Sequence, residues 1–346
     1  MGLRHPADIE AWGRWQRSSS PYRALRTALR RTGIPATVHL TVRGSNPEIL
    51  IALDTTTPTS IASYLRPLTF LHGVSVAILS SQDVLSHLPG AGLRSETSPA
   101  DGSLPGSLGA VRAVLSAGHY LTAGARAFSW SKILRAEYIV VQHGLVTPFA
   151  PPLPPQAHLL SFSEADASFW AGARADVTHE TVGSQLLWEA GRHPRGETDA
   201  DAPPIFLGQL HGAELTRRSL VRASQSFCQK NGAMYRPHPS EIDKLSCLQH
   251  RLWERKGVVI DRSRVPLVDL VNPVVSIFST GVLEAAARGI PAWVYHASPP
   301  PWLQDFWDRY SMSPWGNDPT PSAVQPEREP AQSVALSLQR FVKGAP

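Results

Sequence analysis

The segment RPHP at residues 236–239 holds a histidine between two prolines, directly after a short apolar run. Proline fixes its own φ and pushes the preceding residue towards extended backbone, so His238 is presented on a stiff stretch of chain. Histidine can donate to a phosphate or protonate a leaving group, and arginine binds phosphate with two hydrogen bonds. A lone histidine at a strand end is more often structural. Because an arginine lies beside this one, we expect Arg236, His238 and Pro239 to form part of a phosphate site.

The segment STG at residues 279–281 ends the apolar run VVSIFS and precedes a helical pattern. The free N–H groups and the positive dipole end of such a helix attract anions. The hydroxyls of Ser279 and Thr280 can donate to a phosphate, and Gly281 lets a ligand come close. Glu284, four residues after Thr280, is expected to accept from ribose hydroxyls one turn further in. Ordinary capping of the helix is the alternative, but it does not account for two hydroxyls followed by glycine.

Two residues in the first half are candidates for a general base. His143 follows the apolar run EYIVV and precedes a glycine, where it could remove a proton from an incoming hydroxyl. Asp54 ends another apolar run and is the alternative base, unless it only caps the turn that follows. No HExxH or cysteine-type metal spacing is present, so we expect no metal and no cofactor.

Short apolar runs alternate with helical patterns along most of the chain, which predicts parallel sheets covered by helices. In the helix expected at 240–257, Ser240 is the predicted cap, with Glu241 and Asp243 in the first turn. The expected strands are at 47–54, 74–80, 136–144, 157–163, 177–183, 204–210, 233–239, 258–260, 274–279 and 291–295.

The order of these elements predicts an α/β protein with two Rossmann-like domains facing a central cleft. A polar, proline-rich stretch without periodicity separates the two halves and is expected to be a linker. The expected parts are a basic N-terminal segment (1–45), an N-terminal Rossmann-like domain (46–191), the linker (192–203), a C-terminal Rossmann-like domain (204–312) and a proline-rich tail with a final helix (313–346).

The composition describes a protein that folds in water. Charged residues make up 18% of the chain, the formal net charge is +5, and there are two cysteines, which suits a reducing cytoplasm. No signal peptide or membrane-spanning run is recognised, so a cytoplasmic location is expected. Arginines concentrated near the start could meet an anionic partner, including a membrane surface. They are not interleaved with stacking aromatics, so nucleic acid is not an expected partner.

The His-Pro and Ser/Thr segments together resemble the motif pair of GT-B glycosyltransferases. The pair is similar to that of bacterial sialyl- and polysialyltransferases, capsule polysaccharide enzymes and CDP-glycerol glycerophosphotransferases. The resemblance implies that His238 and Pro239 match the first motif, and Ser279 and Thr280 the second, both at the nucleotide phosphate. VQHG at 141–144 resembles the His-Gly element of the glycerophosphotransferases, which implies that His143 is the base. The tryptophan often seen before that element is Gln142 here.

The expected activity is transfer of a glycosyl or polyol-phosphate group from a CMP- or CDP-linked donor to an acceptor hydroxyl of a surface polysaccharide or related glycan. The reaction would need no metal, because the helix dipole, His238 and Arg236 would neutralise the leaving phosphate. Two alternatives stay open at this point. One is a UDP-sugar-dependent glycosyltransferase or an isomerase similar to UDP-N-acetylglucosamine 2-epimerase. The other is a non-enzymatic basic protein that binds RNA or another polyanion.

Overall fold

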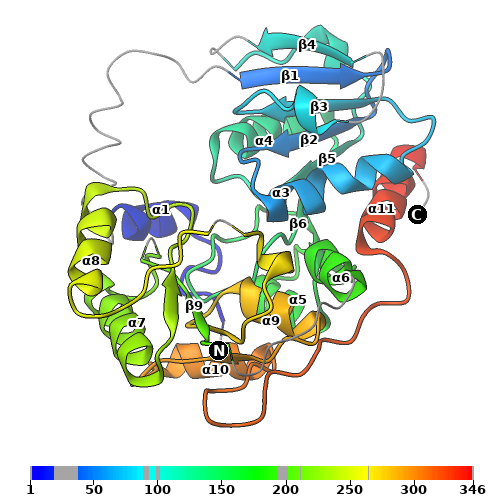
Figure 1. Cartoon of the computed structure of the whole chain (residues 1–346). Helices are drawn as coiled ribbons and strands as arrows, with labels where there is room; N and C mark the ends of the chain where they lie inside the picture. The colour runs from blue at the N-terminus through cyan, green and yellow to red at the C-terminus, as the bar shows by residue number, and fades with distance from the viewer. Residues whose placement is uncertain are drawn as a thin grey trace. The chain divides into compact units, whose positions relative to one another are not determined.

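The computed structural model describes residues 2–18, 38–88, 93–98, 102–193, 202–210, 212–263 and 265–344 (Figure 1). Contacts within the chain divide it into two compact units. One comprises residues 2–186 and 326–346, and the other residues 187–325. We call them the large-sheet unit and the small-sheet unit. Most of the predicted linker, and the predicted basic residues Arg23, Arg26, Arg30 and Arg31, lie outside the described residues.

The large-sheet unit is built on eight strands in the order β4-β1-β3-β2-β5-β6-β7-β8. Six neighbouring strands, β3, β2, β5, β6, β7 and β8, run parallel. At one edge of the sheet, β1 pairs antiparallel with β3, and β4 pairs antiparallel with β1. The strands are β1 (Val38–Arg43), β2 (Ile49–Leu53), β3 (Val76–Ser80), β4 (Leu93–Ser98), β5 (Ala113–Ser116), β6 (Glu137–Val141), β7 (His158–Ser161) and β8 (Thr178–Thr181). β1 lies within the stretch predicted as a basic segment, and β5 is a strand that the sequence does not predict.

Helices cover both faces of this sheet, as the continuous apolar composition of its strands requires. On β2, Leu50 belongs to one buried cluster with Trp130, while Ile51 belongs to the opposite cluster with Leu338. The helical elements are α1 (Ile9–Ser18), the consecutive turns α3 (Pro58–Ser60), η1 (Ile61–Leu65) and η2 (Arg66–Phe70), and α4 (Thr122–Leu134), α5 (Glu164–Ala171) and α11 (Pro330–Lys343), with α6 (Gln185–Arg192) crossing into the other unit. The final helix therefore packs with the first half of the chain.

The small-sheet unit has four parallel strands in the order β10-β9-β11-β12. Their bounds are β9 (Ile205–Leu207), β10 (Met234–Arg236), β11 (Val274–Ser276) and β12 (Ala292–Val294), and the helices are α7 (Arg217–Asn231), α8 (Lys244–Glu254), α9 (Thr280–Ala287) and α10 (Pro301–Arg309). The predicted strand at 258–260 makes only one bridge, between Tyr235 and Ile260. With two helix-covered parallel sheets, the structure confirms the predicted α/β class with two Rossmann-like units.

One predicted helix cap is wrong, and the difference matters for the site. The carboxylate of Asp243 accepts the N–H groups of Leu245 and Ser246 and is the actual cap of α8. Ser240 instead donates its N–H to His238. Glu241, placed by the sequence in the first helical turn, lies before the helix and is buried.

Candidate functional site

In the small-sheet unit, the strand order reverses between β9 and β11, so these neighbours connect to helices in opposite directions along the sheet. Open parallel sheets bind ligands in the crevice at the carboxyl ends of strands at such a point. The residue types that follow β9 and β11 therefore decide what this crevice can hold. Gln209 follows β9, and the segment 276–281 follows β11.

Gln209 connects the two strands through a single oxygen atom. Its Oε1 accepts the N–H groups of Ile277 (3.2 Å) and Phe278 (2.9 Å) and the hydroxyl of Ser276 (3.1 Å). Because two of these donors are main-chain N–H groups, the accepting atom is the oxygen and the amide orientation is fixed. The side-chain nitrogen of Gln209 has no partner among the described residues, although the residue is only 9% exposed. Gln209 therefore offers two N–H bonds at the crevice.

Helix α9 begins at this crevice and keeps part of its N-terminus free. The hydroxyl of Ser279 caps it by accepting the N–H of Gly281 (3.1 Å). Within the described chain, the N–H and hydroxyl of Thr280 have no hydrogen-bond partner, and that side chain is partly exposed. Free N–H groups and the helix dipole at this point suit an anion.

Gly281 has a packing role that the sequence does not predict. A Cβ at this position would come within 2.5 Å of Leu207 Cδ1 and 2.9 Å of Leu267 Cδ2. The missing side chain thus lets α9 approach β9 closely. This brings the free helix start beside the end of that strand.

Glu284 lies one turn into α9 and is partly buried. Its carboxylate has no hydrogen-bond or ionic partner among the described residues, and burial raises the pKa of Glu284 to about 7. A carboxyl group of this kind can accept from sugar hydroxyls when ionised and donate when protonated. The structure places it on α9, one turn after Thr280.

His238 lies beyond the end of β10, on the other side of β9. Its Nδ1 accepts the N–H of Ser240 (3.1 Å), which places the proton of the neutral ring on Nε2. The pKa of His238 is lowered because part of the ring is removed from water, while the charge of Glu241 opposes this shift. The ring lies at the same sheet edge as Gln209 and Ser279.

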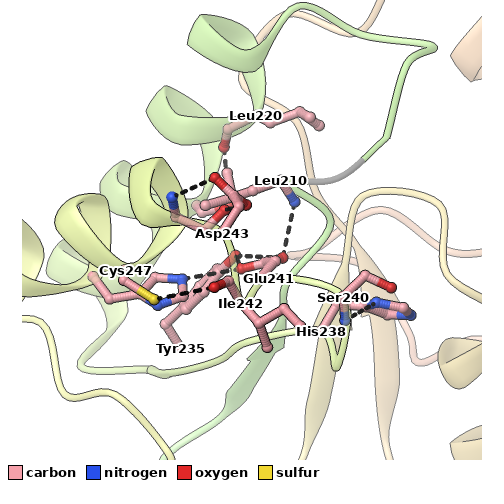
Figure 2. A network of polar contacts seen from close by, with 12 residues as sticks. Leu210, Leu220, Tyr235, His238, Ser240, Glu241, Ile242, Asp243 and Cys247 are labelled. Carbon is pink, nitrogen blue, oxygen red and sulfur yellow. Dashed lines mark hydrogen bonds and ion pairs between the residues drawn. The ribbon is translucent and has the colours of Figure 1, made fainter. Parts of the chain in front are cut away.

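A buried carboxylate organises the loop that carries His238 (Figure 2). Glu241 accepts the N–H of Leu210 (2.9 Å), the hydroxyl of Tyr235 (2.9 Å) and Nε2 of His250 (3.0 Å). Its own N–H donates to the carbonyl of His238 (2.8 Å). Glu241 thus joins the loop after β10 to the loop after β9. The sequence alone suggests a first-turn helix residue and gives no sign of this role.

Arg236 is engaged elsewhere. Its guanidinium forms an ion pair with Asp261 (3.1 Å) and donates to the carbonyl of Val265. These contacts hold the loop that follows α8, so the structure does not bring Arg236 to the anion site. Pro239 is exposed beside His238 and acts there through its fixed backbone.

The large-sheet unit has its own strand-order reversal, between β2 and β5, and there the chain fills the helix start itself. Asp54 follows β2, and its two carboxylate oxygens accept the N–H of Ala123 (2.7 Å) and the N–H of Gly124 (3.0 Å). Both belong to the first turn of α4, whose cap residue, Leu121, makes no side-chain bond. These contacts describe an anchor for α4 rather than a base with a free oxygen.

His143 follows β6, and a tyrosine fixes its ring. Its Nδ1 is 3.1 Å from the hydroxyl of Tyr64, which is itself 3.3 Å from the carbonyl of Val141. When Tyr64 donates to that carbonyl, its oxygen accepts from Nδ1–H, and the Nε2 lone pair of His143 stays available. Burial lowers the pKa of His143, so the ring is neutral at physiological pH. Gln142 supports this turn by donating to the carbonyl of Gly144 (3.0 Å).

Tyr120 is a further candidate that the sequence does not reveal, because it follows β5, a strand that is not predicted. Its ring meets Trp12 edge to face at 5.3 Å. Burial and the charge of Asp54 raise the pKa of Tyr120 to about 12, and its phenol also influences the titration of Tyr64. No partner for the Tyr120 hydroxyl is found among the described residues, so it remains able to donate to a ligand.

Comparisons with known proteins give only distant structural similarity. No family model matches the chain, and no curated protein matches it in sequence. Among solved structures, a glycosyltransferase from Rickettsia africae ESF-5 is 10% identical over 87% of this chain and 94% of its own, with a TM-score of 0.42. KpsC of Thermosulfurimonas dismutans, a beta Kdo 2,4 transferase, is 14% identical over 85% of this chain and 90% of its own, with a TM-score of 0.31.

Proposed function

We propose that this protein is a GT-B-type transferase that moves a glycosyl or polyol-phosphate group from a nucleotide-activated donor to an acceptor hydroxyl. The observation that carries this proposal is the free start of α9 at the strand-order reversal of the small-sheet unit. Two groups there have no partner among the described residues, Thr280 and the side-chain nitrogen of Gln209. His238 lies at the same sheet edge. Such a set of neutral donors suits a phosphate group.

The nucleotide would bind at this edge. Its phosphate would accept from Thr280, the α9 N–H groups and His238 Nε2–H, and the carboxylate of Glu284 would accept from ribose hydroxyls. The cytidine preference rests on the resemblance of the His-Pro and Ser/Thr segments to enzymes that use CMP- and CDP-linked donors. Arg236 has no part in this arrangement because Asp261 and Val265 already hold its guanidinium.

The large-sheet unit would activate the acceptor. His143 Nε2 takes the proton of the acceptor hydroxyl as its oxygen forms the new bond. The bond between the transferred group and the donor phosphate breaks, and its electron pair leaves with the phosphate, where the donors named above stabilise it. Asp54 is not carried forward as a base, since both of its oxygens accept main-chain N–H groups.

Binding of free nucleotides tests the donor site directly. Thermal shifts with CMP, CDP, UMP and UDP should show stabilisation by the cytidine nucleotides, and His238→Ala should remove it. His143→Gln should keep the stabilisation and lose turnover, since that residue acts on the acceptor. Stabilisation by uridine nucleotides alone would favour a UDP-sugar enzyme or an epimerase. No shift with any nucleotide, together with a shift by RNA, would overturn the proposal.

A further inference from the structure

The outward side of α8 carries an exposed row of large apolar side chains. Leu245, Leu248 and Leu252 are 42%, 52% and 40% exposed, and Ile242, just before the helix, is 83% exposed. Their spacing of three or four residues puts them on one side of the helix. No other helix in the described chain exposes more than one large apolar side chain. Single exposed apolar residues are ordinary, but an aligned row marks a contact surface.

A second row on α8, beside the first, is basic. Lys244, Arg251 and Arg255 are exposed, and their spacing of seven and four residues keeps them together on the helix. None of them forms an ion pair with a described residue. The nearby acidic groups are already engaged: Asp243 caps α8, and Glu254 pairs with Arg262 (2.5 Å). We call the four apolar and three basic residues of these two rows the α8 outer face.

The inner side of α8 shows why the helix keeps this orientation. Ser246, His250 and Trp253 are buried. His250 binds Glu241, and Trp253 Nε1 donates to Gln225 of α7 (3.1 Å). The buried polar contacts fix the rotation of α8 about its axis, so the leucines cannot turn inwards without breaking them. Their exposure is therefore a stable property of the fold.

We propose that the α8 outer face docks on an anionic lipid surface. An apolar row that enters the headgroup region, next to basic side chains that reach the phosphates, is how amphipathic helices bind at membrane interfaces. The surface would lie on the membrane without crossing it. Within the described residues, no helix combines the length and the apolar composition needed for a span.

A second copy of this chain is a poorer partner for the same surface. Two α8 outer faces packed together would bring Lys244, Arg251 and Arg255 of each copy near those of the other, with Glu254 already paired. Like charges in such a contact repel. The phosphates of an anionic bilayer complement both rows at once.

Vesicle binding by the full chain provides the test. Cys247 is exposed on α8 and Cys228 is buried, so a thiol-directed fluorophore can report from this helix. We expect the labelled protein to bind vesicles of phosphatidylcholine with phosphatidylglycerol, and to bind pure phosphatidylcholine at least tenfold more weakly. The double variant Leu248→Ser/Leu252→Ser should reduce binding at least tenfold. Arg251→Gln/Arg255→Gln should reduce it about 25-fold at low salt, at roughly fivefold for each basic side chain.

Ile133→Ser is the matched control, because Ile133 is 67% exposed on α4 and lies outside this surface. It should leave vesicle binding unchanged. Equal binding to neutral and anionic vesicles would overturn the proposal. Binding that both double variants retain would also overturn it, because another basic segment would then make the contact. A dimer that the leucine variant converts to monomer, without vesicle binding by the wild type, would overturn it as well. No nucleotide enters these measurements, so their outcome is independent of the proposed transferase activity.

Discussion

The side-chain oxygen of Gln209 accepts three hydrogen bonds from the loop after β11, and its side-chain nitrogen has no partner among the described residues. Gln209→Glu retains an acceptor for Ser276, Ile277 and Phe278, but replaces the two N–H bonds with a second oxygen and adds a negative charge. We expect nucleotide affinity to fall at least tenfold, about 1.4 kcal/mol, while the thermal midpoint changes little. Isothermal titration with the stabilising nucleotide measures this.

Ser276→Ala is the control for Gln209, because it removes one of the three bonds to the oxygen, together with the acceptor of Ser279 N–H, and leaves the nitrogen untouched. Its nucleotide affinity should stay within about threefold of the wild type, since neutral hydrogen bonds of this kind contribute modestly. If Gln209→Glu binds nucleotide as well as the wild type, the side-chain nitrogen does not meet the ligand.

Glu284 predicts a pH dependence of stability. Its folded-state pKa of about 7 lies above the ordinary value of 4.5, so between these values the folded chain binds more protons than the unfolded chain. The free energy of unfolding therefore falls as pH rises through this window, by roughly 3 kcal/mol in total. Urea unfolding at pH 5 and pH 8 should show this loss in the wild type but not in Glu284→Gln. Equal pH dependence of the two proteins would contradict the assignment.

The sequence predicts some of these residues and misses others for identifiable reasons. His143, His238 and Thr280 are singled out because a reactive residue type follows an apolar run, and Glu284 because it lies four residues after Thr280. Tyr120 could not, since a four-residue strand precedes it and gives little periodicity. The sequence also does not show that Arg236 and Asp54 already have partners within the chain. Arg236 binds Asp261 and the Val265 carbonyl, and Asp54 binds main-chain N–H groups of α4, all of them distant in sequence.

At the scale of elements, the network around Glu241 joins β10, α8 and the loop after β9. Glu241→Leu would leave Leu210 N–H, the Tyr235 hydroxyl and His250 without their acceptor. Removing one partner of a buried polar network typically costs about 3 kcal/mol, so we expect a loss of this size in urea unfolding. Nucleotide affinity should fall as well, because the network also positions His238.

Glu254→Ala provides the comparison for Glu241, since it removes an exposed carboxylate at the end of α8 that pairs with Arg262. Such exposed pairs contribute little, so its unfolding midpoint should match that of the wild type. A similar loss in both variants would show that α8 is generally fragile and that Glu241 has no special role.

The elements themselves were predictable where apolar runs and helical patterns alternate clearly. The strands β2, β3, β6, β9 and β11 belong to this group, and they place the carboxyl ends where the candidate residues lie. Neither the antiparallel β1 and β4 nor the central β5 was expected. The cap of α8 was assigned three residues too early, because serine and aspartate are both good caps and only the folded loop shows which one is free.

At the scale of the whole chain, the two units are expected to respond differently to ligand. A nucleotide should slow amide hydrogen exchange at β9, β11 and the start of α9, and leave β2, β5 and α4 unchanged when no acceptor is present. Exchange followed by mass spectrometry separates these peptides. Protection confined to the large-sheet unit would place the nucleotide in the other half of the chain and contradict the assignment of the donor site.

The carboxylate of Asp54 has a consequence for the solution conditions that the protein tolerates. It is an anion tethered beside α4, and its effective concentration at those two N–H groups is far higher than that of dissolved ions. Inorganic phosphate or sulfate cannot displace it, so these ions have little effect at the strand-order reversal of the large-sheet unit. Among the described residues, no carboxylate binds the start of α9. Phosphate buffers should therefore compete with nucleotide at α9 and have no effect near α4.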